Sequence, residues 1–302
     1  MRNQLMNATS TFERYFPLVI AFPAADLSKV SELTEAERQE VLAFLAVRPV
    51  HTVVMTSFVN DNGLQSKLNR GKFYGCRDGA GRLEGVALIG HSTLIEARSE
   101  AALMAFAQQA KNSETPIHLI MSHGTAADSF WNYYSAGLSE PRLRCVERLF
   151  EVRFPFMVRK GGRTVRLATT DELLPVAEAQ AAVALMECGI DPMHRDREGF
   201  LKRVLRRIEQ GRVFVFFDGD ELVFKVDVIA ETGETAYLEG VFVTEKYRGK
   251  GIGSDCLASV TLGLLDRVRN VCLLSNVEFE PAHKTFARAG FQASNECTTL
   301  FV

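Results

Sequence analysis

The stretch VTEKYRGKGIGSDCL, residues 243–257, decides the fold of this chain. It follows an apolar strand-like run at 235–243 and precedes a helix-like run at 253–268. Three alternating glycines, Gly249, Gly251 and Gly253, let successive backbone amides turn to the same side, because glycine tolerates the required angles and has no Cβ. The amides run into a helix N-terminus, whose partial positive charge favours anions. The stretch therefore predicts a phosphate-binding loop between strand and helix.

Two common phosphate motifs do not fit this loop. A GxxxxGK[ST] loop matches no position, since Gly251 is followed by Ile-Gly. A dinucleotide fingerprint needs GxGxxG in the tight turn after a strand, whereas here the spacing is GxGxG and residues 244–248 intervene. A nucleotide-binding protein is the less favoured alternative, and the plainest alternative is a basic turn, with Arg248 and Lys250 facing solvent.

The spacing that remains is Arg-x-x-Gly-x-Gly, from Arg248 to Gly253. Between a strand and a helix, this spacing resembles the acyl-CoA loop of the GNAT superfamily of N-acetyltransferases. A later motif of that family is echoed by Asn276 at the end of the next strand, Ala282 in the next helix and Gly290-Phe291 behind it. The resemblance covers roughly residues 163–302.

The resemblance implies acetyl-CoA as co-substrate and direct transfer of its acetyl group to an amine in a ternary complex. It also implies that the strand separates from its neighbour at residues 240–243, so that free backbone groups hold the pantetheine arm and polarise the thioester carbonyl. The residues implied to bind the cofactor are Val241, Phe242, Val243, Arg248, Gly249, Lys250, Gly251, Ile252, Gly253, Ser254 and Asn276.

Transfer to an amine needs a base that keeps the nucleophile neutral. Glu239 is the candidate, and Tyr237 lies on the same strand face because strand side chains alternate. An ordinary strand carboxylate remains the alternative reading of Glu239. The family resemblance places a leaving-group tyrosine at position 286 and an asparagine at position 279, but both positions are phenylalanine. The general acid is therefore left open among His283, Ser275 and Tyr237.

The chain also repeats itself. LNRGKFYGCRDG at 68–79 matches IEQGRVFVFFDG at 208–219, and FWNYYSAGL at 130–138 resembles KTFARAGF at 284–291. We therefore predict an α/β (α+β mixed sheet) fold made of two tandem GNAT-like domains, each a mixed β-sheet flanked by helices. The expected boundaries are an N-terminal arm at 1–32, a first domain at 33–160 and a second at 161–302, with the glycine-rich RKGGR at 159–163 as linker.

The first domain lacks the glycine loop, since its third strand (91–97) runs almost directly into a helix. It is expected to be a degenerate copy that walls the acceptor site or stabilises the second domain. The catalytic GNAT domain is then the second, and the predicted function is an acetyl-CoA-dependent N-acetyltransferase acting on a small-molecule or peptide amine. The alternative is an acyl-CoA-binding sensor or scaffold without turnover.

The composition indicates which partners, metals and cellular location to expect. The net charge of −2 gives no global field for nucleic acid or anionic lipid, so neither is expected as a partner. The six cysteines form no CxxC pair and lack zinc-ligand spacing to histidine, so we expect buried free thiols, Cys256 included, and no metal. The apolar run at 15–25 is short and interrupted by Pro17 and Pro23, so a cytoplasmic protein is expected. The oligomeric state stays open.

Overall fold

The computed structural model describes residues 25–153 and 163–302. The residues 1–24, with the apolar run, and the linker boundary at 160/161 lie outside this range. The elements of the first half are β1 (Val30–Glu32), α1 (Arg38–Leu45), α2 (Val53–Asn62), β2 (Gly71–Arg77), β3 (Leu83–Gly90), β4 (Ser92–Ala97), α3 (Glu100–Lys111), β5 (Leu119–His123), α4 (Ala126–Ser135) and β6 (Leu143–Arg153).

The second half repeats this order, with a short additional helix. Its elements are β7 (Arg166–Leu167), α5 (Leu173–Cys188), α6 (Pro192–Arg195), α7 (Arg197–Glu209), β8 (Val213–Asp218), β9 (Glu221–Glu231), β10 (Thr235–Val243), α8 (Ile252–Leu265), β11 (Asn270–Asn276), α9 (Glu280–Arg288) and β12 (Gln292–Phe301). The predicted mixed α/β class and tandem organisation are confirmed. Residues 30–32 of the expected arm form β1, which pairs with β2 as β7 pairs with β8.

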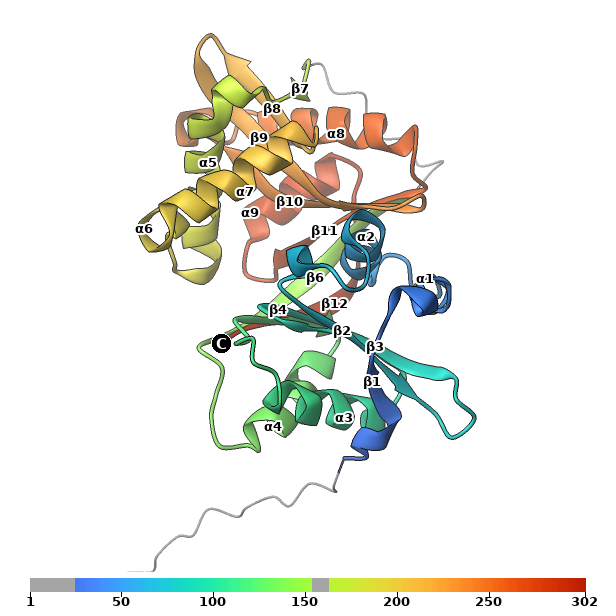
Figure 1. Ribbon diagram of the computed structural model, residues 1–302. Helices are drawn as coiled ribbons and strands as arrows, with labels where there is room; N and C mark the ends of the chain where they lie inside the picture. The colour runs from blue at the N-terminus through green and yellow to red at the C-terminus, as the bar shows by residue number, and fades with distance from the viewer. Residues whose placement is uncertain (1–24, 154–162) are drawn as a thin grey trace, which may run out of the picture.

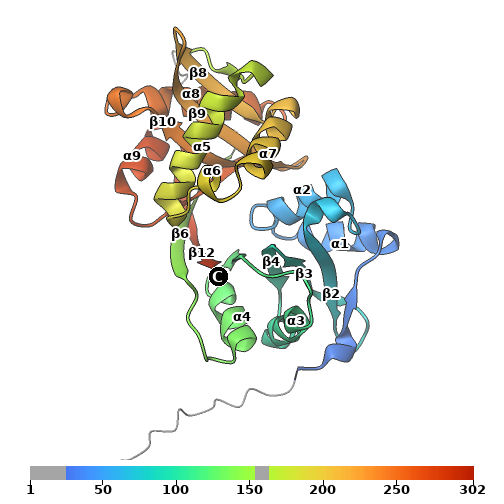
Figure 2. The same cartoon turned by 60° about the vertical axis from the view of Figure 1, so that its left-hand side comes forward.

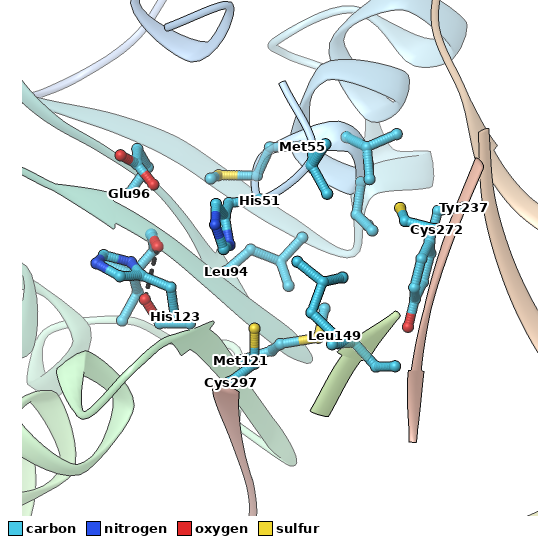
Figure 3. Close-up of a pocket in the computed structure, with 16 residues that line it drawn as sticks. His51, Met55, Leu94, Glu96, Met121, His123, Leu149, Tyr237, Cys272 and Cys297 are labelled. Carbon is cyan, nitrogen blue, oxygen red and sulfur yellow. Dashed lines mark hydrogen bonds between the residues drawn. The ribbon is translucent and has the colours of Figure 1, made fainter. Parts of the chain in front are cut away.

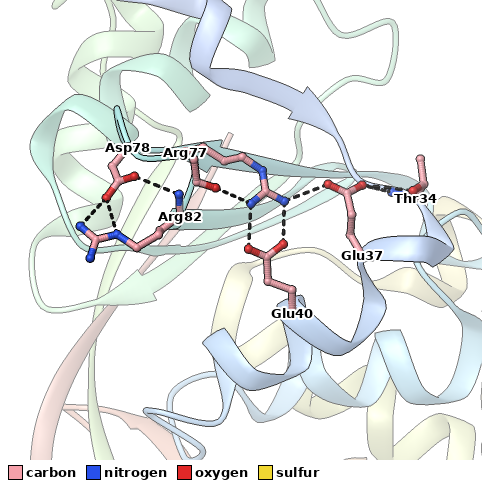
Figure 4. A network of polar contacts seen from close by, with 7 residues as sticks. Thr34, Glu37, Glu40, Arg77, Asp78 and Arg82 are labelled. Carbon is pink, nitrogen blue, oxygen red and sulfur yellow. Dashed lines mark hydrogen bonds and ion pairs between the residues drawn. The ribbon is translucent and has the colours of Figure 1, made fainter.

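Each half begins with the same helix capping box, which an arginine supports. Thr34 and Glu37 form a capping box, as Thr169 and Glu172 do in the second half. In the first half Arg77 bridges Glu37 at 3.0 Å and Glu40 at 2.7 Å (Figure 4). An arginine, Arg166, likewise binds Glu172 at 2.6 Å. The shared cap adds structural support to the duplication seen in the sequence.

All strands of the described chain form one sheet, ordered β1-β2-β3-β4-β5-β12-β6-β11-β10-β9-β8-β7. The final strand of each half is therefore exchanged. β12 pairs with β5 of the first half, and β6 pairs with β11 of the second, while β6 and β12 pair with each other. Figures 1 and 2 show β6 and β12 running side by side where the two halves meet. The exchange brings first-half side chains next to the second-half sheet.

Helices cover both faces of this sheet. In the second half α8 and α9 pack over one face, around Leu238, Leu273 and Phe286. The α5 and α7 helices cover the other face, above Val213 and Phe242. The α7 helix is amphipathic and buries Phe200, Val204 and Ile208, whose spacing places them on one face. The glycine loop connects the end of β10, in the sheet, to the start of α8, in one of the two helix layers.

Candidate active site at the splayed strands

The glycine loop joins β10 to α8. It begins with a 3-10 turn at Glu245–Tyr247 and continues with Arg248 in extended conformation. Gly249 and Gly251 then adopt left-handed angles, φ +74° and +76°, with open space where a Cβ would stand. These two positions need glycine for their conformation, as the alternation predicts.

Gly253 has a different role from the other two glycines. A Cβ there would lie 3.0 Å from Val243 Cγ2 and 3.3 Å from Thr285 Cγ2, so the glycine permits close packing of α8 onto β10. Gly251 is the N-cap of α8 and offers no side-chain cap. Within the described residues, the backbone amides from Gly249 to Ser254 have no assigned acceptor in the protein. A row of amides at a helix N-terminus is thus open to an anion.

The charged side chains of the loop are exposed. Arg248 Nε donates to the carbonyl oxygen of Val243 at 2.9 Å, which ties the loop to the end of β10. Lys250 Nζ lies 5.5 Å from the ring centroid of Tyr247. The Tyr247 hydroxyl donates to Asp218 at 3.1 Å, which anchors the loop to the β8–β9 hairpin. Both basic groups stay close to the open amides.

The first half has no glycine loop between the corresponding strand and helix. Only residues 98–99 connect β4 to α3, whereas residues 244–251 connect β10 to α8. The N-cap of α3 is Ser99, and its hydroxyl accepts from the Ala102 amide at 3.2 Å. A helix that is capped by its own side chain offers fewer free amides to a phosphate. The short connection and the capped helix agree with the prediction that the first half lacks a phosphate-binding loop.

The sheet opens at β10, as expected. β10 pairs in parallel with β11 from Thr235 to Leu238, and no pairing continues to its end at Val243. The register with β9 also shifts between Glu239 and Phe242, so that Gly240 and Val241 have no assigned partner residue on either neighbouring strand. Gly240 sits at φ +63°, the conformation of a β-bulge. The splay exposes backbone groups beside the glycine loop.

A buried charged network supports the bulge. Lys225 is fully buried and pairs with Asp227 at 2.9 Å, while Asp227 also binds Arg207 at 2.6 Å. Gln180 accepts a hydrogen bond from Lys225. A Cβ on Gly240 would stand 2.6 Å from Gln180 Oε1 and 2.8 Å from Lys225 Nζ, so a side chain there would disrupt the network. Burial lowers the pKa of Lys225, which the charge of Asp227 opposes.

Tyr237 and Glu239 lie on one face of β10 and their side chains are hydrogen-bonded, which confirms the predicted alternation. Burial raises the pKa of Glu239, and the hydrogen bond from Tyr237 partly opposes that shift. Burial, with the charges of Glu239 and Glu147, holds the pKa of Tyr237 well above its usual value. A raised pKa makes the carboxylate of Glu239 a stronger base, which suits a group that accepts a proton.

Two carboxylates that the sequence did not single out lie near Glu239. Glu147 comes from β6 of the first half and Glu187 from the last turn of α5. Burial is the main cause that raises the pKa of each to about 7, and the charge of Glu239 adds to both shifts. The side chain of Glu187 is nevertheless exposed to solvent where it lines a cleft, and the charge of Lys225 opposes the rise of its pKa. The position of Glu147 beside the second-half sheet depends on strand exchange, which no local sequence pattern indicates.

A cleft of about 660 Å³ opens beside Glu187, and the side chains of Arg142 and Arg144 also line it. Its walls come from the start of β6 (residues 142–146), the end of α5 (185–189) and the β11–α9 turn (276–279). Asn276 lies in the wall, and its side-chain oxygen accepts from the amide of Glu278 at 2.9 Å. The cleft is large enough for a small organic acceptor.

The residues considered for the leaving-group acid differ in their hydrogen-bond partners. Phe286 is buried in the core, with its ring 5.4 Å from that of Phe150. Ser275 is also buried, and His283 Nε2 donates to the Asn276 carbonyl at 3.0 Å. Tyr237 is the one of the three candidates whose side chain is hydrogen-bonded to Glu239.

A second, smaller cavity of about 40 Å³ lies between the halves (Figure 3). His51, Glu96 and His123 of the first half line it with Tyr237 of the second. Arg48 donates to His123 Nε2 at 3.0 Å, and burial with the Arg48 charge lowers the pKa of His123 to about 4. The volume fits about one water molecule, so this cavity is not an acceptor site.

Among the described residues, no group of three or more His, Cys, Asp or Glu side chains is placed to hold a metal ion. All six cysteines are free, and all but Cys188 are buried. Burial raises the pKa of Cys256 to about 12, so its thiol stays protonated at neutral pH, in agreement with the predicted buried thiol. No helix in the described part of the chain is long and apolar enough to cross a membrane.

Residues 209–293 match the family model described as acetyltransferase (GNAT) domain. That range contains β8 to α9 and the whole glycine loop, so the second half of the chain contains a GNAT domain. No match was found among curated proteins.

Solved structures extend the likeness to both halves. A Drosophila protein shares 12% identity at a TM-score of 0.65, with 91% of this chain and 98% of that chain covered. A GCN5-related N-acetyltransferase from Sphaerobacter thermophilus shares 13% identity at a TM-score of 0.59, covering 89% and 93%. A tandem GNAT protein from the clavulanic acid biosynthesis pathway shares 13% identity at a TM-score of 0.55, covering 90% and 98%. At these identities the likeness shows the fold, which is that of tandem GNAT proteins.

Proposed function

We propose that this chain is an acetyl-CoA-dependent N-acetyltransferase whose active site lies in the second half, with an amine of a small molecule or peptide as acceptor. The observation that carries the proposal is the conjunction of an open row of amides at Gly249–Ser254 with the splay of β10 from β11. The first feature suits a pyrophosphate, and the second suits an extended pantetheine arm that forms backbone hydrogen bonds.

In this proposal the amides of residues 249–254 bind the pyrophosphate of CoA, and Arg248 and Lys250 add positive charge. The exposed backbone of residues 241–243 binds the pantetheine arm and polarises the thioester carbonyl. Asn276 flanks the arm from β11. The acetyl group then lies beside the bulge at Gly240, next to the carboxylate of Glu239.

Glu239 accepts the proton of the attacking amine, directly or through water, and Tyr237 orients Glu239 through their hydrogen bond. The neutral amine attacks the carbonyl carbon, the tetrahedral intermediate collapses, and the C–S bond breaks to release CoA. The thiolate is protonated by Tyr237 or by solvent, since Phe286 carries no proton to donate. The first half, with a capped α3 and no glycine loop, is proposed to be a degenerate copy without cofactor.

One observation favours a second function, an acyl-CoA-binding sensor or scaffold. Phe286 lies in the core where the family resemblance places an acid, so cofactor binding without turnover is the rival. Release of CoA from acetyl-CoA, measured with a panel of amines, separates the two. Amine-dependent release supports the transferase. Tight acetyl-CoA binding with no release in the presence of any amine would establish the sensor instead.

A further inference from the structure

Charged side chains from two strands and a helix meet at the bulge of β10, beside the proposed base. Asp227 on β9 is the register partner of Glu239, so the two side chains project from the same sheet face with Cβ atoms about 5 Å apart. Lys225 lies two residues before Asp227 and projects from that face too. Its Nζ stands 2.8 Å from the point where a Cβ on Gly240, the residue after Glu239, would lie. The base therefore has both a carboxylate and an amine as neighbours on the adjacent strand.

These neighbours are tied to one another away from solvent. The side chains of Lys225 and Asp227 are 0% and 2% exposed, and Arg207 reaches Asp227 from α7 with 28% of its side chain exposed. Asp227 lies 2.9 Å from Lys225 Nζ and 2.6 Å from a guanidinium nitrogen of Arg207. Lys225 Nζ also donates to Gln180, and two acceptors favour the protonated form of the amine. Charges at this depth are screened far less than surface charges.

The charges of this group balance only when Glu239 is included. Lys225 and Arg207 are two cations, and Asp227 is the single anion paired with them. Within residues 25–153 and 163–302, Glu239 forms no ion pair of its own, yet it is in electrostatic contact with both cations. A buried charge needs compensation, so the second cation is the counter-charge for an ionised Glu239.

The other groups that face Glu239 do not supply this compensation. Burial raises the pKa of Glu239. The hydrogen bond from Tyr237 opposes that rise, as do the positive charges of Arg207 and Lys225, whereas the charge of Asp227 adds to it. The remaining charged neighbours are carboxylates from β6 and α5, Glu147 and Glu187. A carboxyl group in such surroundings would keep its proton without the two cations, and a protonated Glu239 could not act as a base.

We infer that Lys225 and Arg207 are positioning residues that keep Glu239 in its carboxylate form for proton transfer, with Asp227 holding both cations in place. The inference rests on the proposed function, because it concerns the base of the same reaction. Both cations act through Glu239 and need no contact with the acceptor or the cofactor. The buried network is thereby part of the site as well as part of the fold.

The titration of Glu239 in the full chain tests this inference. Glutamate carboxyl carbons labelled with ¹³C are followed by NMR over a pH series, and the signal of Glu239 is assigned by its loss in Glu239→Gln. In Lys225→Met and in Arg207→Met, Glu239 should titrate at a higher pH than in wild type, because one cation is lost while the other still pairs with Asp227. Methionine replaces each charge with an apolar chain, which limits the damage to packing. Arg206→Met, at the exposed neighbouring position of α7, is the matched control and should leave the titration unchanged.

Amine acetylation gives the second readout. With one amine that wild type accepts, Lys225→Met should lose about tenfold in kcat at pH 7 and recover most of it at higher pH, with little change in KM for acetyl-CoA. If wild type acetylates an amine while the titration or the pH profile of both cation variants matches wild type, the inference is wrong and the transferase function stands. If wild type acetylates none of the amines in the panel, the proposed function falls and the inference falls with it. Failure of both cation variants to fold, judged by thermal unfolding, would show that the network serves the fold alone and would also overturn the inference.

Discussion

The substitution Gly251→Asp tests the glycine loop without removing a packed side chain. Gly251 sits at φ +76° with nothing within 4 Å of an added Cβ, so the loop has space for the new side chain. The left-handed angle costs an L-residue about 1–2 kcal/mol, and aspartate is among the residues that tolerate it best. We therefore expect a folded protein, slightly destabilised.

The effect on CoA should be larger than the effect on folding. Gly251 is the N-cap of α8, so the new carboxylate would stand among the amides proposed to bind the pyrophosphate. A unit charge about 5 Å from another, at an effective dielectric constant of about 20, interacts by about 3 kcal/mol. The expected result is a rise in Kd for CoA of about two orders of magnitude.

Isothermal titration calorimetry measures the Kd, and thermal unfolding measures the cost to the fold. Gly81→Asp is the matched control, because Gly81 has φ +80° and equally open surroundings in the β2–β3 hairpin of the first half. The control should lose similar stability and keep its CoA affinity. A Kd for Gly251→Asp within threefold of wild type would refute the assignment of the loop.

Three further predictions address the sheet side of the site. Gly240→Ala should lower the free energy of unfolding by about 2–4 kcal/mol in urea denaturation, because it combines a left-handed angle with contacts below 3 Å to Gln180 and Lys225, whereas Gly233→Ala, in open space, should change little. Glu147→Gln should stabilise the protein at pH 8 by on the order of 1 kcal/mol and have little effect at pH 5. The folded pKa of Glu147, about 7, lies above the ordinary 4.5, so the wild-type protein loses stability as the pH rises through this window. A difference between the variant and wild-type unfolding curves that is the same at both pH values would contradict the raised pKa. Tyr237→Phe should lower kcat by about tenfold or more while leaving the Kd for CoA unchanged, and an unchanged kcat would exclude Tyr237 from the reaction.

Local sequence patterns predicted the conformation of the glycine loop, because that conformation depends on neighbouring residues in the chain. The angles of Gly249 and Gly251 and the free helix N-terminus depend on residues that are adjacent in the chain. The splay at Gly240–Val243 came from the family resemblance, and the strand pairing agrees with it. The short connection before α3 is equally visible in the sequence, whereas the cap supplied by Ser99 was not predicted.

The acceptor side could not be predicted in the same way. Glu147 and Glu239 are far apart in sequence, and they come within electrostatic reach of each other because β12 and β6 exchange between the halves. The pattern of β6 fits a strand ending its own domain equally well, so nothing in it indicates a partner in the other half. The network of Lys225, Asp227 and Arg207 was missed for a similar reason, since a charged pair within a strand ordinarily indicates exposure.

The central claim is that CoA binds the second half across the glycine loop and the splayed strands. A crystal structure with acetyl-CoA tests it most directly. We expect pyrophosphate oxygens within hydrogen-bonding distance of the amides of residues 249–254, the pantetheine arm between β10 and β11, and no cofactor in the first half. Acetyl-CoA bound elsewhere, or a pyrophosphate that leaves those amides unused, would contradict it.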